Sequence, residues 1–131
     1  MDGLGEMGRY LCVLLGGGAG SLTRYLVGRA IVQRFPQTNF ALGTFAINVT
    51  GSFLIGLLMT LFVERWKLPQ YWQLAGVVGF LGGYTTFSSF EYDAFLATRG
   101  GHHLAAFGYL VSSVVAGYAA VWAGVLLVAK R

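Results

Sequence analysis

Four stretches of this 131-residue sequence are long, apolar and nearly free of charged side chains, and they cover approximately residues 10–32, 40–63, 71–98 and 103–129. A helix needs about 20 mostly apolar residues to cross a bilayer, whereas membrane β-strands are about half as long and alternate in polarity. The sequence therefore predicts an all-α membrane protein, with four transmembrane helices in a single transmembrane domain over residues 1–131.

The composition supports this class and argues against others. Charged residues make up 11% of the chain and hydrophobic residues 56%, whereas a soluble domain is about one quarter charged. The single cysteine, Cys12, cannot form a disulfide framework. The net charge of +4 comes from scattered basic residues, so no nucleic-acid partner is predicted. No nucleophile–base arrangement is visible, and no enzyme is predicted; the expected surroundings are the lipid bilayer.

The distribution of cations bears on orientation. With four spans, one side of the membrane holds Arg9, Arg65, Lys67, Lys130 and Arg131, and the other holds Arg29, Arg34 and Arg99, with Arg24 further inside its span. This bias is feeble under the positive-inside rule. Insertion in both orientations would allow an antiparallel, dual-topology homodimer with a two-fold axis. The alternative is that Arg65 and Lys67 fix a single orientation.

The third span contains a poor helix core, because Gly82 and Gly83 precede a run of hydroxyl residues. Glycine costs about 1 kcal/mol relative to alanine inside a helix. We therefore expect a break near residues 82–86, in the middle of the membrane. A break would free carbonyls for a small cation and expose a helix N-terminus that favours an anion. The alternative is a continuous helix whose hydroxyls bond back to the i−4 carbonyl.

Three pairs of side chains at helical spacing could line one route through the spans: Thr44 with Asn48, Tyr109 with Ser113, and Phe87 with Phe90. Hydroxyl and amide groups donate hydrogen bonds, and the edges of aromatic rings carry partial positive charge. Such neutral donors suit a small anion that must bind and also leave. Taken singly, the rings could be ordinary packing residues and Asn48 an interhelical hydrogen bond.

Two carboxylates follow this run. Glu91 and Asp93 are two residues apart, so they do not share a helix face, and we expect them at the water-exposed end of the span rather than as a functional pair.

Three segments carry a family resemblance: residues 16–25, residues 43–53 and, most specifically, residues 82–90. In this order they closely resemble the CrcB/Fluc family of microbial fluoride channels. The resemblance implies a fluoride-selective channel in the plasma (inner) membrane that passively exports fluoride from the cytoplasm. It also implies an antiparallel homodimer with two pores and one structural sodium ion at its centre.

The resemblance further implies roles for individual residues. The sodium ion would be held by the backbone carbonyls of Gly82 and Thr85 from each subunit. The pore would be lined by Phe87, Phe90, Asn48, Thr44, Ser89, Tyr109 and Ser113. Arg24 matches an arginine of the first span that would attract anions at the mouth; it could equally be an anchor that extends toward the interface.

Two other functions remain as alternatives. A proton-coupled small multidrug transporter also has four short spans, but it needs an acidic residue in the first span, and residues 10–32 contain none. A non-conducting scaffold subunit would explain the many glycines, but it would leave the hydroxyl-rich third span without a purpose.

Overall fold

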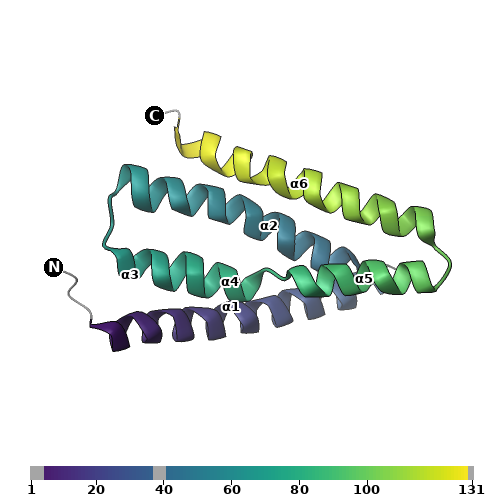
Figure 1. Ribbon diagram of the computed structural model, residues 1–131, viewed down its shortest axis with the longest axis horizontal. Helices are drawn as coiled ribbons and strands as arrows, with labels where there is room; N and C mark the ends of the chain where they lie inside the picture. Colours follow the sequence, from purple (N-terminus) through teal and green to yellow (C-terminus); the bar gives the residue numbers. More distant parts are fainter. Residues whose placement is uncertain (1–4, 37–40, 130–131) are drawn as a thin grey trace.

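A computed structural model describes residues 5–36 and 41–129, and within these ranges the regular structure is entirely helical (Figure 1). The elements are α1 (Glu6–Arg34), α2 (Ala41–Met59), the π-helical segment η1 (Thr60–Arg65), α3 (Gln70–Gln73), the π-helical segment η2 (Leu74–Leu81), α4 (Gly82–Tyr84), α5 (Phe87–Arg99) and α6 (His103–Ala129). The expected start of the second span at Phe40, and the cations Lys130 and Arg131, lie outside the described residues.

Three continuous helices in the described ranges are long and apolar enough to cross a membrane. They are Glu6–Arg34, Ala41–Arg65 and His103–Ala129. The expected span at residues 71–98 is not among them, because it is divided into α3, η2 and α4 before an interruption and α5 after it. The chain is thus an all-α membrane protein in which one apolar segment is interrupted.

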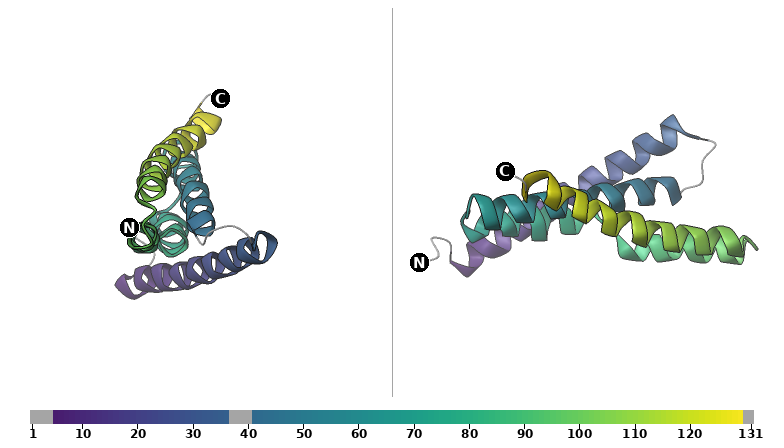
Figure 2. Two further views of the ribbon diagram at one scale, coloured as in Figure 1. Left: turned by 90° about the vertical axis from the view of Figure 1, so that its right-hand side faces the viewer. Right: turned by 90° about the horizontal axis from the view of Figure 1, so that it is seen from above.

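The interrupted segment lies in the middle of the molecule. It passes between α1 on one side and α2 with α6 on the other, as two perpendicular views agree (Figures 1 and 2). The start of α1, the α2–α3 connection and the end of α6 lie at one end of the molecule, and the α5–α6 connection lies at the other (Figure 1).

Glycines bring α1 into backbone contact with the first half of the interrupted segment. A Cβ atom on Gly16 would collide with the carbonyl oxygen of Ala75, and one on Gly20 would collide with that of Phe80. Small residues allow such close approach of helices in lipid. These contacts fix the register of α1 against η2 and α4.

The buried core of a single chain is small. It is formed by Ile47, Leu81 and Tyr84, with a few partly buried apolar neighbours. Many large apolar side chains of α1 and α6 are exposed, as expected for surfaces that face lipid or another protein chain.

Candidate functional site: an interrupted helix beside an open groove

The interruption is short and extended. Helix α4 ends at Tyr84, and the next two residues have β-region dihedrals: Thr85 at φ −82° and ψ 158°, and Thr86 at φ −150° and ψ 116°. Helix α5 then begins at Phe87. Thr86 caps it, because the Thr86 hydroxyl accepts a hydrogen bond from the Ser89 amide at 3.3 Å. The two extended residues lie inside the range 82–86, where the sequence predicts a break.

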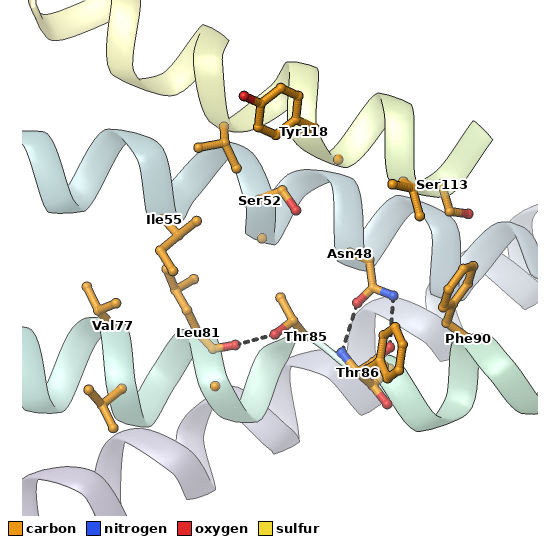
Figure 3. A pocket seen from close by; sticks show the side chains of 17 residues that line it. Asn48, Ser52, Ile55, Val77, Leu81, Thr85, Thr86, Phe90, Ser113 and Tyr118 are labelled. Carbon is orange, nitrogen blue, oxygen red and sulfur yellow. Dashed lines mark hydrogen bonds between the residues drawn. The ribbon is translucent and has the colours of Figure 1, made fainter. Parts of the chain in front are cut away.

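The side chain of Asn48 on α2 forms hydrogen bonds with both the amide and the carbonyl of Thr86. Its Nδ2 donates to the Thr86 carbonyl at 2.9 Å, and the Thr86 amide donates to its Oδ1 at 2.8 Å (Figure 3). Buried backbone groups need partners, and an interrupted helix at membrane depth cannot obtain them from lipid. The side chain of Asn48 therefore replaces bonds that a continuous helix would make for itself.

Thr85 is held by three neighbours. Its amide and its hydroxyl both donate to the Leu81 carbonyl at 2.9 Å, so hydroxyl back-bonding and a helix break occur together. Its methyl group packs against the bare Cα of Gly51 on α2. Its carbonyl accepts a hydrogen bond from Nη1 of Arg24 on α1 at 3.3 Å.

An open groove of about 690 Å³ lies beside the interruption, between α2, α6 and the interrupted segment (Figure 3). The groove is lined by six of the residues predicted for the site, namely Asn48, Gly82, Thr85, Phe87, Phe90 and Ser113. The other four, Thr44, Ser89, Tyr109 and Arg24, do not line it. The predicted site therefore divides into a groove and a set of residues behind it.

Phe90 joins these two parts. Its ring lies 5.8 Å from that of Phe87, centroid to centroid, and 5.2 Å from that of Tyr109 in an edge-on arrangement. Phe90 is buried, with 6% of its surface exposed, whereas Phe87 is 70% exposed. One ring of the pair is thus fixed by packing, and the other lies on the open surface.

The sequence matches the family described as "CrcB-like protein, Camphor Resistance (CrcB)" over residues 11–125. The chain belongs to the CrcB family. A relative from Solibacter usitatus (strain Ellin6076), named "Fluoride-specific ion channel FluC", is 54% identical over 91% of this chain and 97% of its own length. Relatives with the same name from Acidobacterium capsulatum and Gloeothece citriformis are 48% and 42% identical, covering 91% and 92% of this chain and 94% and 96% of their own lengths.

These matches confirm the resemblance found in the sequence. They also confirm that the chain is not an enzyme, since the relatives are named as ion channels. Membership in a bacterial CrcB family, together with several apolar helices, makes the chain a multi-pass membrane protein.

A buried carboxylate lies behind the groove in this CrcB-family chain. Asp93 on α5 is 7% exposed, and its Oδ2 accepts a hydrogen bond from the Tyr109 hydroxyl on α6 at 3.4 Å. The Thr44 hydroxyl lies beside both groups. Asp93 Oδ1 is buried and has no hydrogen-bond partner among the described residues.

The position of Asp93 corrects the expectation that it lies at the exposed end of the span. Glu91 is exposed, as expected, but Asp93 is covered because α5 packs against α6 on that side. Asp93 is three residues after Phe90, so the two share a helix face. That spacing was the signal that could have assigned Asp93 to the site.

Two serines complete the set. Ser113 lines the groove, and its Oγ is buried without a partner among the described residues. The Ser89 hydroxyl accepts a hydrogen bond from the Thr86 hydroxyl at 3.0 Å. The Ser113 hydroxyl is thus covered although the residue lines the groove, and the Ser89 hydroxyl takes part in the cap of α5.

The carbonyls of Gly82 and Thr85, which are expected to hold a sodium ion, are of the ligand type that such an ion prefers. Gly82 and Thr85 both line the groove, and backbone oxygens are the ligands that hard cations prefer. A carbonyl has two lone pairs, so the bond from Arg24 leaves one of them free on Thr85. Two carbonyls are too few to enclose a cation, so a bound sodium ion would need further oxygen ligands.

Proposed function

We propose that the chain forms a fluoride-selective channel that lets fluoride leave the cytoplasm passively through the plasma (inner) membrane. The observation that carries this proposal is the extended break at Thr85 and Thr86, held by Asn48 beside a groove that contains Phe87 and Phe90. The name "Fluoride-specific ion channel" of its relatives supports the same function.

The donors around the groove suit a small, strongly hydrated anion. Asn48 Nδ2 carries two hydrogens, and the Thr86 carbonyl uses one, which leaves the second for a ligand. The first amides of α5 lack partners within the helix and point toward the break. The edges of the Phe87 and Phe90 rings add partial positive charge. Together these groups would replace water around fluoride.

Release of the anion follows from the absence of a formal charge. None of the described residues that line the groove is ionisable apart from the phenol of Tyr118. An anion held by neutral donors is bound weakly enough to move on, which conduction requires. In this proposal the hydroxyls of Ser113, Tyr109, Thr44 and Ser89 are the next contacts along the route, and that of Tyr109 must release Asp93 before it can donate to the anion.

The working unit in this proposal is an antiparallel, dual-topology homodimer with two pores. The four-span arrangement places the third span's break in the middle of the membrane. The open groove of one chain is then covered by the second chain. The carbonyls of Gly82 and Thr85 from both chains hold one structural sodium ion on the two-fold axis. Such an ion would supply positive charge to the carbonyl oxygens of Gly82 and Thr85 at the two breaks.

The test is anion efflux from liposomes that contain the purified protein, read with a fluoride electrode and repeated with a chloride electrode. Rapid loss of fluoride without loss of chloride is expected. No fluoride efflux from verified dimers would refute the channel and return the transporter and scaffold alternatives. Equal efflux of both anions would refute the selectivity.

The Phe87→Ile variant tests the assignment of the pore. It replaces a ring edge with an aliphatic surface, so fluoride efflux should be abolished while the protein still forms dimers. Phe95→Ile is the matched control, because Phe95 lies on the same helix, is 54% exposed and does not line the groove. Unchanged efflux in Phe87→Ile would remove Phe87 from the pore.

A pair of variants with fixed orientations tests the antiparallel dimer. Added cations at one end of the chain or at the other should each favour a single orientation. Each variant alone should then be inactive, and coexpression should restore fluoride efflux. Full efflux from one fixed orientation would refute the antiparallel arrangement.

A further inference from the structure

Arg24 has a specific partner deep in the molecule. It lies ten residues before the end of α1 at Arg34, which corresponds to roughly 15 Å along the helix. A guanidinium at such a depth needs a hydrogen-bond acceptor, because lipid offers none. The half-buried Arg24 finds this acceptor in the Thr85 carbonyl, 3.3 Å from its Nη1.

The Thr85 carbonyl is an acceptor that the break itself creates. In a continuous helix it would accept from the amide four residues later, which belongs to Ser89. That amide donates instead to the Thr86 hydroxyl at 3.3 Å. The break thus leaves the Thr85 carbonyl without its helical donor, and α1 supplies a replacement.

The two extended residues are consequently held from two different helices. Asn48 on α2 binds the amide and the carbonyl of Thr86, and Arg24 on α1 binds the carbonyl of Thr85. Backbone contact aligns α1 for this task, since a Cβ on Gly83 would collide with the Gly17 carbonyl.

We propose that Arg24 is a positioning residue. By donating to the Thr85 carbonyl it holds the extended backbone of the break in place and so fixes where α5 begins, at Phe87. The expected effect of Arg24 on fluoride conduction rests on the proposed function, whereas its expected effect on the backbone at Thr85 and Thr86 does not. This role differs from attraction of anions at the mouth, which needs only the charge. A positioning residue controls how firmly the backbone at Thr85 and Thr86 is held, even with no anion present.

Hydrogen–deuterium exchange in fluoride-free buffer separates the two roles. Arg24→Gln removes the charge and shortens the side chain, and Arg29→Gln removes the same charge from an exposed position on the same helix. Loss of one hydrogen bond from a charged donor should speed exchange of the Thr85 and Thr86 amides about tenfold in Arg24→Gln. Arg29→Gln should exchange like the unmodified chain. Fluoride efflux should fall in Arg24→Gln alone.

Unchanged exchange in Arg24→Gln would overturn the proposal, whether or not efflux falls; a fall in efflux alone would assign Arg24 to anion attraction. If Arg24→Gln does not fold, Arg24→Lys replaces it in the same measurement. Lysine keeps the charge but not the reach of the guanidinium, so faster exchange supports the proposal and unchanged exchange overturns it. If the unmodified protein conducts no fluoride, the proposed channel fails while the exchange comparison still decides the role of Arg24.

Discussion

The α2–α6 pair and the interrupted segment solve the same problem in opposite ways. Helices α2 and α6 are continuous, so their backbone groups bond within the helix except at its ends, and the two helices meet through glycine. A Cβ on Gly124 would collide with the Phe53 carbonyl, and one on Gly56 would collide with the Val121 carbonyl. At Thr85 and Thr86 the helix stops, and side chains from two other helices supply the missing partners.

The two regions serve different purposes: the α2–α6 pair stabilises the molecule, and the interrupted segment provides groups that can bind a ligand. Close packing makes the α2–α6 pair a rigid frame, but the middle of a continuous helix leaves no backbone group free for a ligand. An interrupted helix exposes amides and carbonyls, and it persists only where specific side chains compensate for the lost bonds. The frame should therefore be sensitive to added volume, whereas the break should be sensitive to lost hydrogen bonds.

The largest effect is expected from added volume in the frame. Gly124→Ala places a methyl group against the Phe53 carbonyl, which belongs to a backbone that cannot easily move, and should cost about 3 kcal/mol of stability. Gly108→Ala on the same helix is the control, because nothing lies within 4 Å of its added Cβ. Thermal unfolding in detergent measures both. If Gly124→Ala and Gly108→Ala unfold at the same temperature, the close backbone contact between α2 and α6 at Gly124 does not contribute to stability.

The next largest effect concerns the break. Asn48→Ala leaves the amide and the carbonyl of Thr86 without the two bonds seen here, which should cost about 2 kcal/mol and abolish fluoride efflux. Ser52→Ala is the control, since Ser52 lines the same groove from the same helix. Unfolding and liposome efflux should both separate the two variants. Normal efflux in Asn48→Ala would show that the break holds without this side chain.

Much of this arrangement could be predicted from local sequence. Uncharged stretches locate the apolar helices, and the pair Gly82 and Gly83 before a run of hydroxyls locates the interruption. The four-residue spacing of Thr44 and Asn48 predicts that both lie on one face of α2, and the structure shows that Asn48 there reaches the break. These features depend on helix geometry and on the backbone preferences of glycine, both of which act over a few residues.

The contacts between helices could not be predicted in this way. The partner of Arg24 depends on how far α1 slides along the interrupted segment, which glycine packing decides. The burial of Asp93 likewise depends on a partner distant in sequence, because its carboxylate is bound by Tyr109, sixteen residues away. The π-helical segments η1 and η2 have no signature in the sequence that we can name.

A smaller effect is expected at the buried carboxylate, which lies between the two regions. Tyr109→Phe keeps the ring against Phe90 but removes the donor to Asp93, so stability should fall by about 1 kcal/mol and fluoride efflux should fall several-fold. Tyr118→Phe is the control, because Tyr118 lies on the same helix, lines the groove and is 67% exposed. Equal efflux from the two variants would exclude the Tyr109 hydroxyl from the route.

The smallest effect is expected at a hydrogen bond that joins the frame to the break. The Thr50 hydroxyl on α2 lies 2.7 Å from the Ala46 carbonyl and 2.9 Å from the Tyr84 hydroxyl, just before the break. Because the threonine has one hydroxyl proton and donates it to Ala46, the tyrosine must donate to the threonine. Thr50→Val removes this acceptor with little change of shape and should cost about 0.6 kcal/mol, as interhelical bonds in membranes do.

A double-mutant cycle with Tyr84→Phe isolates this bond from the back-bond to Ala46. Thr23→Val is the control for the back-bond alone, since Thr23 donates to the Ala19 carbonyl at 2.8 Å within its own helix. A coupling energy near zero would mean that Tyr84 is held by packing against Gly51 and Phe80 without help from Thr50. The polar contacts that hold the chain at the break would then be the bond from Ser21 to the Gly83 carbonyl and those at Thr85 and Thr86.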